Sequence, residues 1–519
     1  MALSRAQRCL VLLLRFLSRV HLALIGLASR APFPVAFFAS SSSPSLSLSL
    51  FPSGKAAAAA AVVAAALPAP RDAARAVPPP EHPLLLLSAT ELARRIRRRK
   101  VTCVDVIETY IARIRQVNPL INAVVKDRFE AALQEAHQVD QLLSECHDDE
   151  EALEEKFPFL GVPVTIKEAF ELHGLPNTSG LVNRRNIVSK SDAMVVSRLK
   201  QAGAIPLGVT NCSELCMWFE SSNRIYGRSN NPYDLQCIVG GSSGGEGSIL
   251  GAAGSVIGVG SDVGGSIRMP AFFNGIFGHK PTTGVVPNDG QFPTAVGIRR
   301  NFLCTGPMCR YAEDLEPMLR VMAGPNVSKL KLNEEVSLGD IKFYSMEHDG
   351  GSIFVSPVDK ELLQAHRKVV KRLETDLATQ VQNVTIHDMK YSLQIWSVMM
   401  SAKTSDGQET QAFTDLLGDH GKPVWPSWEL LKWLLGMSPH TLPAIALGIG
   451  EKFLKYTPKQ NARLANKAQK LQAEMVNLLG DDGVLLYPSH PVVAPKHHTP
   501  WQCLSILPTQ PSSTSWVYP

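Results

Sequence analysis

The sequence predicts an α/β fold built on a twisted, largely parallel sheet. Short β-branched runs, which are typical of buried strands, alternate along the chain with segments of helical periodicity. This alternation favours parallel strands, because each crossover between parallel strands is usually made by a helix. The chain has 519 residues, of which 45% are hydrophobic, so it can bury a sizeable core in one large domain or in a few smaller ones.

The predicted elements start near Leu84, where the body of the chain begins. A helix opens at Ser88, which stands three residues before Glu91 in the spacing of a capping box. Further helices are expected in "CVDVIETYIARIRQV", in "RFEAALQEAHQVDQLLSEC" and in "SDAMVVSRLKQAGA", the last of them capped. Strands are expected in "NAVV", in "IPLGVTN" and in "FLGVPVTIKEA", which ends near Lys167.

Two segments of unusual composition precede the body. Residues 1–38 are apolar but interrupted by arginines, which favours a single N-terminal anchor on an endomembrane or lipid droplet; mitochondrial targeting is the alternative. Residues 39–83 are rich in serine, then alanine, then proline, as linkers are. Because the positive charge is concentrated in these two segments, the body is nearly neutral. The nearly neutral body disfavours nucleic acid as a partner. The apolar N-terminal segment makes a membrane the expected partner.

The cysteines and histidines indicate neither a disulfide framework nor a metal site. Nine cysteines are scattered along the chain, and close pairs such as Cys212 and Cys216 have no second pair with zinc-ligand spacing. His497 and His498 are adjacent, but solvated loop histidines are the better interpretation. The prediction is that the protein uses no metal and no cofactor.

The stretch "IVGGSSGGEGS", residues 238–248, admits several interpretations. A flexible linker is disfavoured because apolar segments flank the stretch on both sides. A phosphate-binding loop is excluded because no lysine follows Gly245. Residues 240–244 match GxSxG, the nucleophile elbow of α/β-hydrolases, but glycine-rich sequence satisfies that pattern easily. A tight backbone site, which glycines permit, remains.

A second cluster, "GVGSDVGGSIRMPA" at residues 258–271, places Ser266 after two glycines. Successive amides before a serine can form an oxyanion hole that includes the amide of the serine itself. Lys167 at the end of an upstream strand can take the serine proton if burial holds the lysine neutral. Together these features predict a serine hydrolase that lacks a catalytic histidine. Asp262 and Arg268, which flank the cluster, are expected to form a structural ion pair.

Taken together and in order, "GVPVTIKEAF", "GGSSGGEGS" and "GVGSDVGGSIRMPAFFNGIFGHKPTTG" resemble the amidase signature family. The resemblance covers roughly residues 85–495, and "VTNCSELCMWFESSNRIYGRSNNPYDLQ" together with Glu246 is similar to its fatty-acid amide hydrolase branch. It implies a mixed, largely parallel sheet with helices on both faces. It also implies a lipid amide as substrate, cleaved through an acyl-enzyme.

The same resemblance implies a role for each motif residue. Lys167 corresponds to the general base, Ser242 to a bridging serine reached through a cis peptide, and Ser266 to the acylated nucleophile. The implied oxyanion-binding amides are those of Val263, Gly264, Gly265 and Ser266. Without the resemblance, Lys167 would be interpreted as a surface lysine and Ser242 as a turn former. Met217, Trp218 and Phe219 are more often core residues, but could line an acyl pocket.

Several alternatives stay open. Residues 424–455 form either an interfacial helical cap for lipid substrates or two buried helices broken at Pro439 and Pro443. The substrate could instead be a small polar amide, or the site a Ser-His-Asp triad. The catalytic domain is expected at residues 84–500, with its C-terminal part missing, and residues 501–519 form a divergent tail. This ending raises the alternative of an inactive product. A homodimer is an open expectation.

Overall fold

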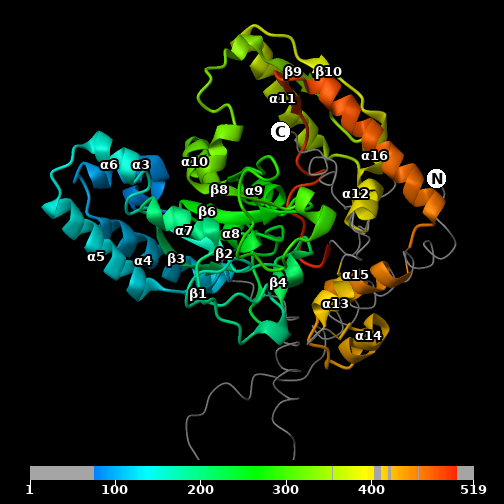
Figure 1. The fold of residues 1–519 in the computed structure, drawn as a ribbon, viewed down its shortest axis with the longest axis horizontal. Coiled ribbons are helices and arrows are strands. Elements are labelled where there is room, and N and C mark those ends of the chain that lie inside the picture. The colour runs from blue at the N-terminus through cyan, green and yellow to red at the C-terminus, as the bar shows by residue number, and fades with distance from the viewer. Residues whose placement is uncertain (1–74, 353–354, 402–410, 419–421, 454, 500–519) are drawn as a thin grey trace, which may run out of the picture.

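The computed structural model describes residues 75–352, 355–401, 411–418, 422–453 and 455–499 (Figure 1). The expected N-terminal anchor, most of the expected linker and the expected divergent tail lie outside the described residues. The end of the expected linker is part of the body instead. The amide of Val77 donates to the carbonyl of Pro232 at 2.9 Å, and Arg113 donates to the carbonyl of Pro78 at 2.7 Å.

The central sheet is mixed, with parallel strands at its middle. Its six strands follow the order β1-β3-β2-β6-β8-β7. Strands β3, β2 and β6 pair in parallel, whereas antiparallel pairs add β1 at one edge and β8 and β7 at the other. The strands span Val124–Asp127 (β1), Pro163–Lys167 (β2), Ile205–Thr210 (β3), Ile257–Asp262 (β6), Phe277–Gly278 (β7) and Cys304–Cys309 (β8).

Helices cover both faces of this sheet, as expected (Figure 1). On one face, Glu246 of α8 (Gly244–Gly251) lies against Gly258 of β6, and α4 packs beside α8. On the other face, Met318 of α10 lies with its sulfur 3.8 Å from that of Cys309 of β8. The remaining helices of this part are α3 (Ala89–Arg97), α4 (Cys103–Ile121), α5 (Phe129–Glu145), α6 (Glu150–Lys156), α7 (Met194–Gln201), α9 (Arg268–Asn274) and α10 (Leu315–Ala323).

Most local predictions are confirmed, and one needs correction. The Ser88 hydroxyl caps α3 by accepting a hydrogen bond from the Glu91 amide at 3.2 Å, and β2 ends at Lys167. Helix α7, however, has no side-chain cap. Asp192, the acid near its start, accepts hydrogen bonds from the His173 amide and from Lys200 instead, both at 2.8 Å. The Asp192 carboxylate therefore binds groups outside the first turn of α7 and does not accept a hydrogen bond from an amide of that turn.

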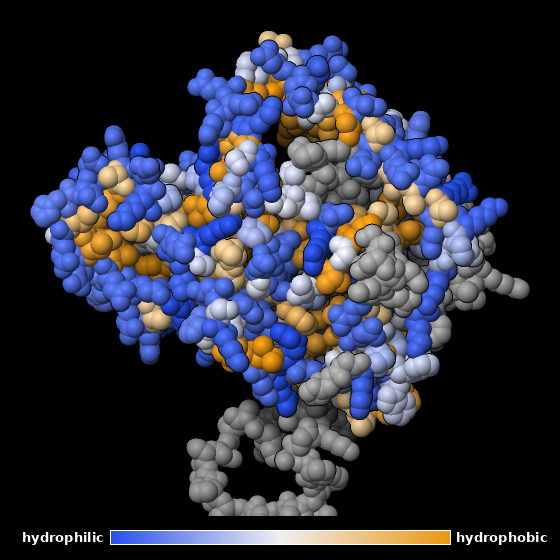
Figure 2. Space-filling model, in the orientation of Figure 1, coloured by the Kyte–Doolittle hydropathy of each residue, from blue (hydrophilic) through white to orange (hydrophobic). Residues whose placement is uncertain are grey.

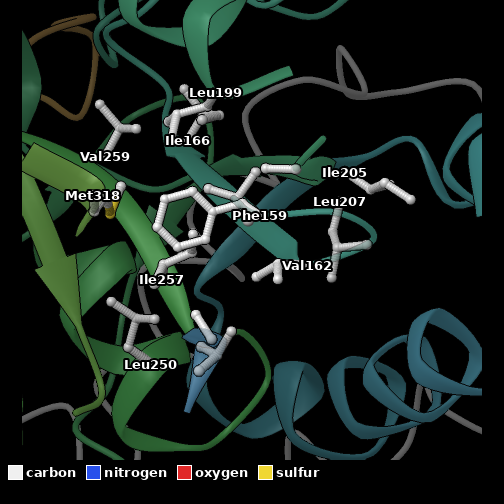
Figure 3. Packing of buried hydrophobic residues seen from close by; sticks show 14 of the residues in the cluster. Phe159, Val162, Ile166, Leu199, Ile205, Leu207, Leu250, Ile257, Val259 and Met318 are labelled. Atoms are coloured by element: carbon white, nitrogen blue, oxygen red, sulfur yellow. The ribbon is translucent and has the colours of Figure 1, made fainter. Parts of the chain in front are cut away.

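The main hydrophobic core lies around the parallel strands. Figure 3 shows side chains from several elements in contact there, including Phe159 before β2, Ile166 of β2, Leu207 of β3 and Ile257 of β6. All of these side chains are fully buried or nearly so. Burial of a side chain of this size contributes about 1.5–3 kcal/mol. The core thus holds rigid the strand ends from which the site residues project.

A second sheet and a helical segment complete the described chain (Figure 1). The second sheet, in the order β10-β9-β11, is parallel throughout and has its own apolar cluster, which includes Ile395 and Leu471. No helix in the described ranges combines the length and apolarity needed to cross a bilayer. The remaining elements are β4 (Ser222–Asn223), β5 (Gly227–Arg228), β9 (Lys342–Ser345), β10 (Gln382–Asn383), β11 (Gly483–Leu486), α11 (Lys360–Leu377), α12 (Ser392–Met400), α13 (Phe413–Leu417), α14 (Pro426–Leu434), α15 (Leu442–Phe453) and α16 (Pro458–Leu479).

Candidate active site

Lys167 lies at the carboxyl end of β2, in the middle of the sheet, and its side chain is completely buried. Its Nζ donates to the Oγ of Ser242 at 2.7 Å and to the Oγ of Ser261 at 3.0 Å. The surface-lysine interpretation is therefore wrong. A buried amine held by two hydroxyls, with no acid as a hydrogen-bond partner, is placed to exchange protons with them.

The glycine-serine stretch forms a compact bend just before α8. The peptide between Gly241 and Ser242 is cis, as the family resemblance implied, and Gly240 has a φ of 80°. A Cβ on Gly240 would lie 2.9 Å from the nitrogen of Pro270, and one on Gly241 would lie under 3.0 Å from the carbonyl oxygen of Trp218. The glycines thus allow close backbone packing, and the bend is not a flexible linker.

Replacing Gly241 by alanine is expected to damage both stability and activity. The new methyl group would overlap the Trp218 carbonyl, so the bend that carries Ser242 must shift. We expect a loss of about 1–3 kcal/mol in unfolding free energy and a severe loss of amide hydrolysis. Gly339→Ala is the matched control, because its Cβ would meet nothing nearer than Ser337 at 3.7 Å. Equal stability and activity in the two variants would contradict this packing argument.

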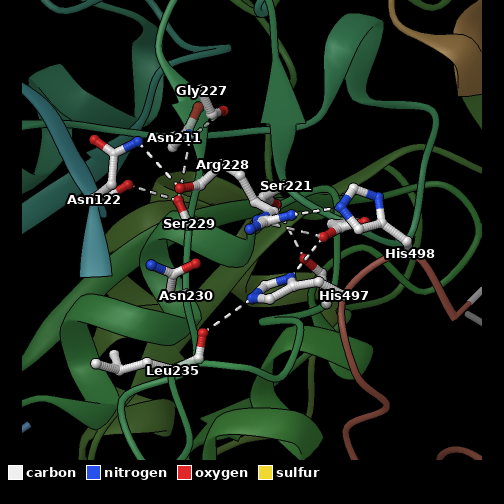
Figure 4. Close-up of polar contacts among 12 residues, drawn as sticks. Asn122, Asn211, Ser221, Gly227, Arg228, Ser229, Asn230, Leu235, His497 and His498 are labelled. Atoms are coloured by element: carbon white, nitrogen blue, oxygen red, sulfur yellow. Dashed lines mark hydrogen bonds and ion pairs between the residues drawn. The ribbon is translucent and has the colours of Figure 1, made fainter. Parts of the chain in front are cut away.

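Ser221 holds the bend from the other side, and Figure 4 shows it near His497 and His498. The Ser221 hydroxyl lies 3.0 Å from the Gly240 carbonyl and accepts a hydrogen bond from the Gly244 amide at 2.9 Å. Next to it, Nδ1 of His497 lies 2.6 Å from the Glu220 carboxylate. His497 is therefore a nearly buried structural residue, and its interpretation as a solvated loop histidine is wrong.

Ser266 lies between β6 and α9, in a loop that Asp262 organises. The Asp262 carboxylate forms an ion pair with Arg268 at 3.0 Å, as predicted, and accepts a hydrogen bond from the Gly265 amide at 2.7 Å. Burial raises the pKa of Asp262, but the charge and hydrogen bond of Arg268 outweigh burial and hold the pKa at about 2. A permanent carboxylate thus fixes the loop on both sides of Ser266.

This loop corrects the expected oxyanion hole. Because the Gly265 amide already donates to Asp262, it is not free to bind an oxyanion. The amides of Val263, Gly264 and Ser266 have no hydrogen-bond acceptor within the described ranges. These three amides remain the candidates for stabilising a negative oxygen.

The structure brings the two serine motifs together. The Ser243 amide donates to the carbonyl of Ser266 at 3.1 Å, so the residue after Ser242 touches the residue expected to be acylated. Ser266 is 9% exposed, and its hydroxyl has no hydrogen-bond partner in the part of the chain that the structure describes. Lys167 and Ser242 are in direct contact, whereas no hydrogen bond joins Ser242 to Ser266 in this structure.

Glu246 of α8 is a buried acid near Lys167. Its carboxylate accepts hydrogen bonds from the hydroxyls of Thr165 and Thr210, both at 2.7 Å. Burial raises the pKa of Glu246 to about 7, against the lowering effect of these hydrogen bonds. The folded state therefore binds this proton more tightly than the unfolded chain, whose pKa is the ordinary 4.5.

This raised pKa predicts how stability depends on pH. The stability that protonated Glu246 adds to the folded state is fully present below pH 4.5 and is lost as the pH rises through about 7. Between about pH 5 and 8, the unfolding free energy of the wild type should therefore fall by about 1–3 kcal/mol more than that of Glu246→Gln. Urea unfolding at several pH values measures this difference. Parallel pH profiles for the two proteins would contradict the prediction.

Sequence reasoning missed Ser261, the second hydroxyl on Lys167. Ser261 is in the quoted motif, but strand alternation gives no reason to aim it at a lysine on β2. Met217, Trp218 and Phe219 are partly buried, and the rings of Trp218 and Phe219 lie 4.9 Å apart. Within the described ranges, no group of three or more histidine, cysteine or acidic residues could hold a metal ion.

Comparisons with known proteins identify the family of this chain. Residues 105–511 match the model of the family described as Amidase. Human "Fatty-acid amide hydrolase 2" is 63% identical over 431 residues, which cover 83% of this chain and 81% of that protein. "Fatty-acid amide hydrolase 2-A" of Danio rerio is 59% identical over 433 residues, with 83% and 81% covered.

A solved structure titled "Fatty acid amide hydrolase" shares the fold, with a TM-score of 0.64 at 24% identity; the match covers 84% of this chain and 74% of that one. Fold, motif order and sequence identity thus agree. The chain belongs to the amidase signature family and is an amide hydrolase.

Proposed function

We propose that this chain hydrolyses fatty-acid amides, such as N-acylethanolamines and primary fatty amides, with Lys167, Ser242 and Ser266 as catalytic residues. The observation that carries this proposal is the buried contact of 2.7 Å between Lys167 Nζ and Ser242 Oγ. Beside this contact lies Ser266, whose loop offers amides without an acceptor. The names of the relatives that cover most of this chain support the substrate class.

The proposed reaction is an acyl transfer to serine followed by hydrolysis. Neutral Lys167 takes the Ser242 proton while Ser242 takes that of Ser266, and the Ser266 oxygen attacks the amide carbonyl carbon. The amides of Val263, Gly264 and Ser266 bind the negative oxygen. The proton returns through Ser242 to the amide nitrogen as the C–N bond breaks, so a neutral amine leaves. Water then cleaves the ester by the same route, which releases the fatty acid.

Helix α14 supports a lipid substrate because it presents apolar side chains to the outside. Figure 2 shows hydrophobic surface where α14 lies. For residues 424–455 the alternatives were an interfacial cap and two buried helices, and the two helices differ. Helix α15 is partly buried, whereas α14 and the turn after it expose several apolar side chains. This exposed set, which we call the α14 face, comprises Trp425, Trp428, Leu431, Leu434, Leu435 and Met437, each 45–65% exposed.

The turn between the two helices differs from the expected one. The chain reverses at Gly436, which has a φ of 69°. Pro439 lies in this turn, as expected. Pro443, by contrast, lies within the first turn of α15 and breaks no helix, because a proline there needs no backbone donor.

The α14 face is tied to the site residues through Glu214. The Glu214 carboxylate lies 2.8 Å from Nδ1 of His440, in the turn between α14 and α15, and also accepts a hydrogen bond from the Thr441 amide at 2.8 Å. All three groups are buried or nearly so. Glu214 stands in the loop after β3 whose Trp218 carbonyl touches Gly241. An apolar outer surface and the catalytic bend therefore contact the same short loop.

The test of this function compares a long fatty amide, such as oleamide, with propionamide on the full-length protein. If several buried methylenes each contribute about 0.8 kcal/mol, kcat/KM should favour the long amide by about 10³-fold or more. A preference for the short amide would assign the protein to small polar amides. No hydrolysis and no labelling by a fluorophosphonate would show an inactive product.

The α14 face is expected to bind lipid surfaces. Replacing Trp428, Leu435 and Met437 by serine should lower the fraction bound to phosphatidylcholine vesicles by about tenfold or more, because apolar burial in the interface is lost. Cosedimentation measures binding. Serine at Val336 and Val369, which are similarly exposed elsewhere, provides the matched control. Each protein is also tested without residues 1–74, because the N-terminal segment is itself expected to bind membranes. If the α14-face variant without residues 1–74 binds vesicles as well as the unsubstituted protein of the same length, the assignment is overturned.

A further inference from the structure

The loop that carries Ser266 is in contact with Trp396 of α12, a residue to which the proposed reaction gives no part. The indole Nε1 of Trp396 donates to the carbonyl oxygen of Val263 at 3.0 Å. A Cβ on Gly264 would lie 3.4 Å from Cζ2 of the same ring. The indole therefore borders the peptide between Val263 and Gly264, which contains one of the candidate oxyanion amides.

Hydrogen bonds to the carbonyls of this loop fix the directions of its amides. In a trans peptide, the C=O and N–H groups lie in one plane and point in opposite directions, so a donor that holds the carbonyl also orients the amide. The peptide between Gly265 and Ser266 is trans. Its carbonyl accepts a hydrogen bond from the Met269 amide at 2.8 Å. The first turn of α9 thus orients the Ser266 amide.

Trp396 holds the preceding free amide in the same way, but with a side chain. The peptide between Val263 and Gly264 is also trans, and its carbonyl is the one that accepts from the indole. In the part of the chain that the structure describes, no backbone amide donates to this carbonyl. Without the indole N–H, the peptide could rotate, because glycine tolerates many backbone conformations. A carbonyl turned into the site would repel the oxyanion that the Gly264 amide would otherwise bind.

The position of Trp396 is set outside the central sheet. Helix α12 packs against α16, and Ile395, the residue before Trp396, is buried in the apolar cluster of the second sheet. At the end of the helix, the Met400 carbonyl accepts a hydrogen bond from Arg299 at 3.1 Å. Trp396 and Val263 are 133 residues apart in the chain. The second apolar cluster therefore contributes a donor to the loop that carries Ser266.

We propose that Trp396 is a positioning residue, which orients the Gly264 amide toward the oxygen that becomes negative. This inference rests on the proposed function, because it requires an oxyanion at this loop. Loss of one direct oxyanion donor costs about 10²–10³-fold in kcat. Since Trp396 acts only through the amide, loss of its N–H should cost less, about tenfold to a hundredfold.

Two substitutions remove the N–H group. Trp396→Phe keeps an aromatic ring. Benzothienylalanine, introduced at position 396 by amber suppression, keeps the size and shape of the indole with sulfur in place of the N–H, and it tests the hydrogen bond if Trp396→Phe fails to fold. Ile395→Val is the matched control on the same helix, because it loosens the second apolar cluster and leaves the indole in place. It should lower the unfolding temperature without lowering kcat.

The full-length proteins are assayed with oleamide and with propionamide, and thermal unfolding is measured beside activity. Both forms that lack the N–H should lose kcat by similar factors on the two amides, with KM little changed, because the oxyanion is common to both reactions. A fatty trifluoromethyl ketone provides a second measurement, since its carbonyl becomes an oxyanion when serine attacks it. Its inhibition constant should rise by the factor by which kcat/KM falls.

Two results would overturn the proposal. One is an unchanged kcat in the benzothienylalanine form. The other is a loss confined to KM for oleamide, which would make Trp396 a wall of the acyl-binding site. A wild type that hydrolyses propionamide and not oleamide would count against the proposed substrate class alone, because the variants are then compared on propionamide.

Discussion

Ser266→Ala should abolish both amide hydrolysis and labelling by a fluorophosphonate. The alanine lacks the only oxygen that the proposed mechanism acylates, so the remaining rate depends on substrate binding and the oxyanion amides alone. Removal of the nucleophile in serine hydrolases costs about 10⁶-fold in kcat, and a loss of at least about 10³-fold is expected here. Hydrolysis of a long-chain amide and gel detection of a fluorescent fluorophosphonate measure the two effects.

A matched control for this variant is Ser255→Ala. Ser255 is also a buried serine, but it precedes the opposite end of β6 and hydrogen-bonds to the Ile257 carbonyl at 2.9 Å. Its loss should cost stability without removing the labelled group. If Ser266→Ala kept full activity and accepted the probe, the nucleophile would be another residue.

Lys167→Met is expected to lower kcat by about 10²–10⁴-fold, the range that general acid–base catalysis contributes. Methionine has nearly the same length as lysine but cannot exchange protons with Ser242. The substitution also leaves the hydroxyls of Ser242 and Ser261 without their shared donor, so thermal unfolding is measured beside activity. A Ser-His-Asp triad would not need the lysine.

The pH profile separates the base from a structural role for Lys167. If the base at residue 167 takes the serine proton, the pH profile of kcat/KM in the wild type should differ from that in Lys167→Met, which has no amine at this position. Labelling by fluorophosphonate should slow in parallel, since the probe reports activation of Ser266. A Lys167→Met protein that unfolds at the wild-type temperature and retains the wild-type pH profile would exclude Lys167 as the base.

Local features of the fold could be predicted because they depend on residues near one another in the sequence. Ser88 and Glu91 are three residues apart, and the Ser88 hydroxyl caps α3 as expected. The β-branched run before Lys167 forms β2 and ends at the lysine. The order of strands and helices then predicts an α/β body. These predictions succeed because hydrophobic periodicity and capping act within one or two turns.

Predictions about the hydrogen-bond partner of one particular side chain or amide were wrong where another residue binds that group in the structure. The segment "SDAMVVSRLKQAGA" was expected to form a capped helix, but α7 has no side-chain cap, and the nearby Asp192 binds the His173 amide and Lys200. The Gly265 amide looks free for an oxyanion, but Asp262 accepts its hydrogen bond. His497 looks solvated, but Glu220 holds it in a nearly buried pair. His173 is 19 residues from Asp192 and Glu220 is 277 residues from His497, so local sequence does not identify these partners. Asp262 is only three residues before Gly265, and their hydrogen bond depends on how the loop between β6 and α9 folds.

The sequence alone determined which chemical groups this protein has: a lysine at a strand end and two serines in glycine-rich segments, in the order of the amidase signature family. Only the tertiary structure decided which of these groups meet. Lys167 and Ser242 are 75 residues apart in the chain, and their contact exists because α8, which Ser242 precedes, packs against β2. Residue spacing constrains contacts within a helix or a turn, but folding of the whole core is needed to bury an amine against a distant hydroxyl.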